Sequence, residues 1–227
     1  HRFTKMTLEA RNSPQHPEGL TPTQEALADS LFEVGAIKFG AFRLRLHERN
    51  PEAPLSPYYV DLRVLPRYPE VMKQAARAYA QVAKEAGHYD VVMGIPEAGN
   101  PLATAFSLET GTPQIYLRKE EKIGHGIPGN FMTPINQGET VLLLDDLVTQ
   151  ADSKLEAINT LESSGLVVRD VVVLVDREQG GSKQLADVGY RLHAASGFSK
   201  LLDYYHRTGK IDGAKYQEAK EYMAANS

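Results

Sequence analysis

Two adjacent carboxylates, Asp145 and Asp146, follow an apolar run (141–144) and precede a short polar segment (149–153). A buried strand with this sequence would deliver both acids at its end, just before a turn and the start of a helix. The free N–H groups and positive dipole of a helix N-terminus bind anions, and carboxylate oxygens bind hard cations. The segment therefore suits a ligand that carries both hydroxyl and phosphate groups.

A purely structural explanation of this segment stays open at this point. Asp145 and Asp146 could solvate the end of a strand, while Thr149 and Asp152, three residues apart, could cap the next helix. An isolated pair of acids is more often structural than catalytic, so the surrounding sequence must decide between the two explanations.

The elements around the acid pair alternate between apolar runs and stretches with helical spacing. Four runs are mostly apolar without alternation, as in strands covered on both faces: 91–95, 114–117, 141–144 and 171–175. Helical stretches separate or follow them near 100–110, 152–164 and 179–187. This alternation predicts an α/β fold with a mainly parallel, twisted sheet flanked by helices. Ligands of such sheets bind beyond the carboxyl ends of the strands.

The chain before the first of these runs divides into two parts. Residues 1–20 are mostly polar, contain two prolines and have no apolar periodicity, so we expect a flexible N-terminal arm. Residues 21–227 are expected to form a single domain. Thr21 and Pro22 begin one predicted helix, and the spacing of apolar residues over 68–86 predicts another.

Composition excludes several classes of protein. The 227 residues are 42% hydrophobic and 24% charged, with a net charge of −4, which is typical of a soluble globular protein and predicts no nucleic-acid partner. No apolar run approaches the roughly 20 residues that span a bilayer, so no membrane association is expected. Cysteine is absent, which excludes disulfides and thiolate catalysis and agrees with a cytoplasmic location.

Further segments occur around the acid pair in a fixed order: 39–44, 56–63, 118–122, 138–140, 176–181, 191–193 and 199–202. In this order, and with the acid-pair segment, the chain from about residue 22 to its end resembles the orotate phosphoribosyltransferases, including those fused in uridine monophosphate synthases. The resemblance implies the type I phosphoribosyltransferase fold with a small N-terminal hood. It also implies transfer of a phosphoribosyl group from phosphoribosyl pyrophosphate to orotate, giving orotidine 5′-monophosphate.

The resemblance assigns catalytic roles to four residues. Asp145 and Asp146 would hold the ribose hydroxyls and the magnesium-bound pyrophosphate, so Mg²⁺ is the implied cofactor. Arg118 and Lys122 would neutralise the leaving pyrophosphate from a mobile basic loop. In the family this loop closes over the site of the neighbouring subunit, which implies a homodimer.

The remaining implied residues would bind substrate. Thr149 and Arg177 would contact orotate, and a guanidinium suits this role because it can grip a carboxylate with two parallel hydrogen bonds. Tyr59 and Val60 would lie beside the pyrimidine ring. The full substrate-binding set is Arg45, Tyr59, Val60, Lys119, His125, Thr149, Gln150, Ala151, Asp152, Ser153 and Arg177.

Two acids stand where the family's pattern has other residues. Asp152 lies in the phosphate-binding segment, and Glu97 lies where bacterial members commonly carry a tyrosine. A carboxylate about 4 Å from a phosphate would cost about 4 kcal/mol at an effective dielectric constant of about 20. Either Lys154 compensates this charge or Asp152 turns outward as a capping group. A rival hypothesis is therefore a non-catalytic or retuned protein of this fold that binds a nucleotide or another small metabolite.

Overall fold

The computed structural model describes residues 19–117 and 131–227. Its centre is a five-stranded sheet of β3 (Val91–Gly94), β4 (Gln114–Ile115), β5 (Thr140–Val148), β6 (Val167–Asp176) and β7 (Arg191–Gly197). The strand order is β4-β3-β5-β6-β7, and every neighbouring pair is parallel. The predicted parallel sheet is confirmed, although β4 is shorter than the apolar run that predicted it. Most of the predicted arm, residues 1–18, lies outside the described residues.

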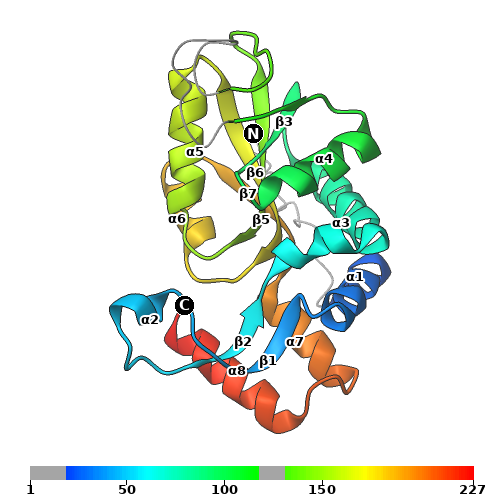
Figure 1. Ribbon diagram of the computed structural model, residues 1–227, viewed down its shortest axis with the longest axis vertical. Coiled ribbons are helices and arrows are strands. Elements are labelled where there is room, and N and C mark those ends of the chain that lie inside the picture. The colour runs from blue at the N-terminus through cyan, green and yellow to red at the C-terminus, as the bar shows by residue number, and fades with distance from the viewer. Residues whose placement is uncertain (1–18, 118–130) are drawn as a thin grey trace, which may run out of the picture.

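Helices cover both faces of this sheet (Figure 1). One face packs against α1 (Pro22–Glu33), α3 (Pro69–Val82) and α4 (Gly99–Thr110), and the other against α5 (Asp152–Ser163) and α6 (Gly181–Asp187). Alternate residues of β5 serve the two faces, since Leu142 belongs to the first cluster and Leu143 to the second. This double coverage is the reason for the continuous apolar runs. Short 3₁₀ segments, η1 (Leu62–Arg67) and η2 (Ala83–Glu85), flank α3.

A smaller lobe lies beyond the carboxyl ends of the strands, and we call it the hood. It contains the antiparallel pair β1 (Ile37–Phe42) and β2 (Ser56–Val60), the short helix α2 (Leu46–Arg49), and the C-terminal helices α7 (Phe198–Arg207) and α8 (Gly213–Ala225). The hood was expected from the N-terminal segments alone. The structure instead builds it from both ends of the chain, because α8 packs on β2. Tyr58 of β2 and Phe198 of α7 lie with ring centroids 4.2 Å apart.

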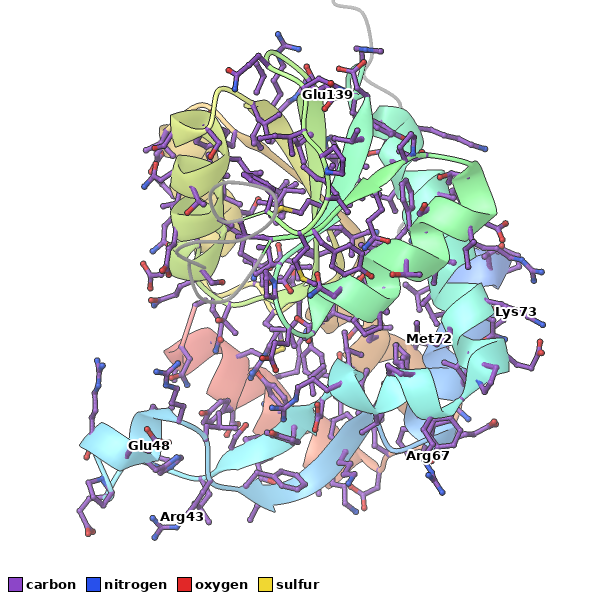
Figure 2. All side chains as sticks on the ribbon, turned by 45° about the horizontal axis from the view of Figure 1, so that its top comes forward. Arg43, Glu48, Arg67, Met72, Lys73 and Glu139 are labelled. Carbon is purple, nitrogen blue, oxygen red and sulfur yellow. The ribbon has the colours of Figure 1, made fainter. Side chains whose placement is uncertain are left out.

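Charged side chains such as Arg43 and Glu48 on the hood and Lys73 on α3 point away from the ribbon (Figure 2). Within the described part of the chain, no helix combines the length and apolarity that crossing a bilayer requires. The buried polar residues of the described chain are few and include Asp145, Lys154, Asp170 and Arg177. Three of these four lie at or beside the predicted site.

Candidate active site

Three connections converge at the carboxyl ends of β3, β5 and β6. The acid pair lies within the last four residues of β5, which runs to Val148; a bend over 149–151 follows, and α5 begins at Asp152. Glycines allow the neighbouring connections to approach closely. A Cβ on Gly99 would lie 2.8 Å from the Leu144 carbonyl oxygen, and one on Gly181 would lie 2.5 Å from Cγ2 of Val148. Larger residues at these two positions would push the β3–α4 and β6–α6 connections away from β5.

Asp145 turns its carboxylate into the protein, and its side chain is only 8% exposed. Its Oδ1 accepts a hydrogen bond from the Asp146 N–H (2.9 Å), and its Oδ2 accepts one from Nζ of Lys154 (2.6 Å). The Tyr79 hydroxyl donates to the Asp145 carbonyl oxygen (2.8 Å). Both side-chain oxygens and the carbonyl of this residue therefore have internal partners.

Asp146 is less buried and less well paired than Asp145. Its Oδ1 accepts a hydrogen bond from the Leu147 N–H (2.7 Å), and among the described residues no hydrogen bond reaches its Oδ2. Burial, followed by the negative charge of Asp145, raises the pKa of Asp146 to about 7. A carboxyl group with an available oxygen and a raised pKa at a strand end is typical of a ligand-binding position.

From the sequence it stayed open whether Lys154 compensates the charge of Asp152. Lys154 is buried in α5 together with Ala157, Ile158 and Leu161, a spacing that defines the apolar face of this helix. Its Nζ donates to Oδ2 of Asp145 and to the Leu147 carbonyl oxygen (2.7 Å). A lysine in register with an apolar stripe was the sequence signal that a buried anion lies opposite. Lys154 binds Asp145, and within the described chain no hydrogen bond or ion pair joins it to Asp152, so it does not pair with the acid in the turn.

The turn after the acid pair is open to an anion. Ala151 is the N-cap residue of α5, and no side chain caps this helix. The structural explanation in which Thr149 and Asp152 cap the helix is therefore wrong. Asp152 is exposed and has no hydrogen-bond partner among the described residues, so its carboxylate caps none of the N–H groups of the turn. The Ala151 N–H donates to Oε1 of Gln184 on α6 (2.7 Å).

Arg177 approaches the turn from the end of β6. Its N–H donates to the Val148 carbonyl oxygen (2.9 Å), and its guanidinium lies over the ring of Tyr58, 5.3 Å from the centroid. The residue is only 8% exposed, and its Nε and Nη2 have no hydrogen-bond partner within the described chain. Because buried N–H groups are costly to leave unpaired, this guanidinium is suited to an anionic ligand.

The residue after Arg177 fixes the connection. Glu178 adopts a left-handed backbone conformation (φ 57°), and its carboxylate accepts hydrogen bonds from the N–H (2.7 Å) and Oγ (2.9 Å) of Ser199. Ser199 lies in the first turn of α7, so the contact anchors the Arg177 connection to the hood. A negative side chain near a helix N-terminus is also stabilising.

The structure does not bring three hood residues of the predicted set to the acid pair. Tyr59 packs against Phe42 and accepts a hydrogen bond from Nη2 of Arg63, Val60 is buried, and Arg45 is exposed at the start of α2. In the described chain, no hydrogen bond or ion pair joins these three to Asp145 or Asp146. Tyr58, which points to the opposite face of β2 from Tyr59, is the residue in contact with Arg177.

Seven of the predicted residues form the acid pair or the turn 149–153, and four others lie outside the described residues. Arg118, Lys119, Lys122 and His125 fall outside the described residues. Glu97 is exposed in the connection after β3, next to a cis peptide bond that joins it to Pro96. No cluster of three acidic or histidine side chains able to hold a metal ion forms in residues 19–117 and 131–227. Any metal ion here would need ligands beyond these side chains.

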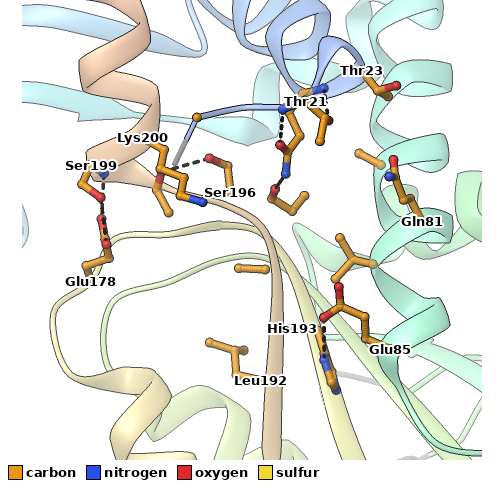
Figure 3. Close-up of a pocket in the computed structure, with 17 residues that line it drawn as sticks. Thr21, Thr23, Gln81, Glu85, Glu178, Leu192, His193, Ser196, Ser199 and Lys200 are labelled. Atoms are coloured by element: carbon orange, nitrogen blue, oxygen red, sulfur yellow. Dashed lines mark hydrogen bonds and ion pairs between the residues drawn. The ribbon is translucent and has the colours of Figure 1, made fainter. Parts of the chain in front are cut away.

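A cavity of about 430 Å³ lies apart from the acid pair, between α1, α3 and the free edge of β7 (Figure 3). Its wall includes Thr21, Gln81, His193 and Lys200, and it shares Glu178 with the connection described above. Asp145, Asp146 and Arg177 do not line it. The acid pair, the turn and Arg177 thus lie outside this cavity, at the carboxyl ends of the strands, where ligands of parallel sheets bind.

Comparisons with known proteins agree with this geometry. Residues 65–192, more than half of the chain, match the family model of the phosphoribosyl transferase domain. An orotate phosphoribosyltransferase of Thermoplasma volcanium is 35% identical over 175 residues, which cover 77% of this chain and 98% of that protein. The bifunctional enzyme PyrF/PyrE of a Nostoc species is 34% identical over 207 residues, which cover 88% of this chain.

Solved structures give the same result. The UMP synthase of Leishmania donovani superposes with a TM-score of 0.78 and 33% identity over 89% of this chain. The chain spans only 42% of that structure and 41% of the Nostoc enzyme, so it corresponds to one part of these fused proteins. Fold, site and relatives together establish that the chain belongs to the phosphoribosyltransferase family, among the orotate phosphoribosyltransferases.

Proposed function

We propose that the chain transfers the 5-phosphoribosyl group of phosphoribosyl pyrophosphate to orotate, giving orotidine 5′-monophosphate and pyrophosphate. The observation that carries this proposal is the buried guanidinium of Arg177, which has two unpaired nitrogens and whose backbone N–H binds the end of β5 at Val148. An acidic base satisfies both nitrogens at once through its carboxylate. The names of the relatives support the same reaction.

The donor would lie across the strand ends. Its 5′-phosphate would lie in the turn 149–153, where the N-cap residue provides no side-chain cap for α5 and, of the backbone N–H groups, that of Ala151 donates to Gln184. Because Asp152 is exposed, solvent screens its charge and weakens its repulsion of a phosphate in this turn. The ribose hydroxyls would then donate to Asp146, whose Oδ2 is available.

Magnesium fits this arrangement through the donor rather than through a cage of side chains. Mg²⁺ commonly keeps several waters and binds to one or two carboxylates together with substrate phosphates. Asp146 can provide one such carboxylate, and the pyrophosphate would provide the other oxygens. When bound, the ion would offset the negative charge of the leaving pyrophosphate.

The protein's own contribution would be positioning and electrostatic stabilisation. Arg177 orients the base, the turn holds the phosphate, and the carboxylate of Asp146 stabilises positive charge that develops on the ribosyl ring as the bond to pyrophosphate breaks. Arg118, Lys119 and Lys122 would neutralise the leaving group, and His125 belongs to the same segment. This assignment places no group in the role of a general base.

Turnover with different bases tests the proposal. The purified chain with phosphoribosyl pyrophosphate and Mg²⁺ should release pyrophosphate when orotate is added, and far less when uracil, which lacks the carboxylate, replaces it. Arg177→Leu should raise the KM for orotate about a hundredfold, which corresponds to loss of a charge-assisted pair. The matched control is Arg169→Leu, an exposed arginine on the same strand, which should behave like the wild type. Binding of the donor without turnover would instead favour the rival, a non-catalytic binding protein.

We also propose that the active form is a homodimer in the cytoplasm, with the basic segment of each subunit acting at the partner's site. A symmetric dimer with two shared sites makes a direct test possible. Lys122→Ala and Asp146→Asn variants, each inactive alone, should regain activity when their subunits are mixed, because one hybrid site has both residues. Absence of any recovery in a mixture shown to contain hybrid dimers would contradict the shared site.

A further inference from the structure

The acid pair is not symmetric, and Lys154 is the cause. Its ammonium group has three donors and three nearby acceptors: Oδ2 of Asp145 (2.6 Å), the Leu147 carbonyl oxygen (2.7 Å) and Oγ of Ser153 (3.5 Å). The lysine side chain is 5% exposed and its carboxylate partner 8%. The cation is thus buried inside the segment that the donor would occupy, and it is directed at only one of the two acids.

The two carboxylates differ in how many of their oxygens already accept hydrogen bonds. Asp145 uses Oδ1 for the Asp146 N–H and Oδ2 for Lys154, and its low exposure leaves little access for a ligand. Asp146 uses Oδ1 for the Leu147 N–H, and its more exposed side chain keeps Oδ2 available among the described residues. A ribose hydroxyl or a metal ion therefore finds one free carboxylate oxygen, not four.

Stability alone does not explain a lysine at this position. Replacing a buried ion pair by apolar residues of similar volume is often neutral or stabilising, and the neighbouring buried positions of α5 are apolar. A lone carboxylate left at position 145, however, would be buried next to the charge of Asp146. The lysine removes this repulsion and holds the carboxylate of Asp145 away from the ligand side.

We propose that Lys154 is a positioning residue that confines Asp145 to an internal ion pair, so that Asp146 alone presents a carboxylate to the ribose of the donor. The proposal rests on the proposed transferase function and refines the roles of its acid pair. The two aspartates, which the resemblance treats as equivalent, have separate tasks. Asp145 shapes the strand end, and Asp146 contacts the substrate.

A double-mutant cycle tests this division of roles. Lys154→Met should lower kcat/KM for the donor by at least about tenfold, because it leaves the carboxylate of Asp145 buried without its partner. Adding Asp145→Asn to Lys154→Met should recover kcat/KM to within about tenfold of the wild type, since no buried charge is then left without its partner. Asp146→Asn should lower kcat/KM by at least about a hundredfold with or without the other changes. A double variant as inactive as Asp146→Asn would overturn the proposal.

A second measurement keeps the test independent of turnover. Urea unfolding of the same variants should show coupling between positions 154 and 145 and much weaker coupling between 154 and 146. Equal coupling to both acids would also overturn the proposal. If the wild type has no transferase activity, the proposed function fails, whereas the unfolding cycle still decides whether Lys154 serves Asp145 alone.

Discussion

The two ends of the parallel sheet each contain a buried aspartate, and these two aspartates have different hydrogen-bond partners. Asp170 lies on β6, opposite Arg191 at the amino end of β7. It accepts hydrogen bonds from Nε and Nη2 of Arg191 (both 2.8 Å), Nε2 of His193 (2.7 Å) and the Gly87 N–H (3.2 Å). At the carboxyl end, Asp145 has one cation and lies beside a second acid. The amino end surrounds a single carboxylate with donors, whereas the carboxyl end has two neighbouring carboxylates and one lysine, which is paired with Asp145 alone.

The ionisation of the two ends reflects this difference. Burial alone would raise the pKa of Asp170, but the hydrogen bonds from Arg191 and His193 hold that pKa below its ordinary value. Burial and the charge of Asp145 raise the pKa of Asp146 to about 7. A carboxyl group with enough donors is typical of a structural role, whereas one left short of donors is typical of a site that awaits a ligand. We therefore infer a structural role for Asp170 at the amino end of the sheet and a ligand-binding role for Asp146 at the carboxyl end.

Exchanging the carboxylates for amides at the two ends should separate activity from stability. Asp146→Asn should lower kcat/KM by about a hundredfold to a thousandfold, the range for loss of one preorganised electrostatic contact in the transition state. The kcat/KM of Asp170→Asn, assayed well below its unfolding temperature, should stay within about threefold of the wild-type value, because this residue lies far from the carboxyl ends of the strands. The measurement is steady-state formation of orotidine 5′-monophosphate. Equal losses of kcat/KM in both variants would contradict separate roles for the two ends of the sheet.

The raised pKa of Asp146 should also make the stability of the protein depend on pH. The folded-state pKa of Asp146 is raised, so the folded protein retains a proton that the unfolded chain has lost between about pH 4 and pH 7. The contribution of Asp146 to stability is therefore fully present below pH 4 and is lost as the pH rises through 7. The largest slope for one proton is about 1.4 kcal/mol per pH unit.

Urea unfolding without magnesium or substrate measures this effect as the difference between the wild type and Asp146→Asn. The variant should gain stability relative to the wild type as the pH rises from 4 to 7. A difference that does not change with pH would show that Asp146 titrates normally. Asp170 has the opposite sign, since its lowered pKa gives stability above pH 4 that is lost in acid.

A change at the amino end of the sheet should lower the stability of the protein rather than its activity. Asp170→Asn should lower the free energy of unfolding by about 2 kcal/mol, because hydrogen bonds to charged groups from Arg191 and His193 are weakened together. Asp187→Asn is the matched control, since its partner Lys183 lies on the exposed surface of α6, and it should cost less than about 0.5 kcal/mol. Similar costs for the two variants would contradict a structural role for Asp170.

The sequence predicted those parts of the molecule that depend on local pattern. The apolar run 141–144, the acid pair and the following helix are consecutive in the chain, so the strand–turn–helix arrangement was readable and is confirmed. The helical spacing of Lys154 with Ala157 and Ile158 also carried a local signal, although its meaning needed the structure.

Contacts between distant segments were not predictable in the same way. Arg177 meets Tyr58 across more than a hundred residues, and only the position of the hood decides that Tyr58, rather than Tyr59, faces the guanidinium. The C-terminal helices complete the hood for the same reason, since α8 packs on β2 from the other end of the chain. The roles of Arg118, Lys119, Lys122 and His125 stay predictions from resemblance.

A crystal structure of the chain with phosphoribosyl pyrophosphate and magnesium tests the central claim most directly. The account predicts the 5′-phosphate in the turn 149–153, the ribose hydroxyls on Asp146, and an intact ion pair between Lys154 and Asp145. A donor bound elsewhere, a turn without phosphate, or Asp145 released from Lys154 to contact the ribose would contradict it.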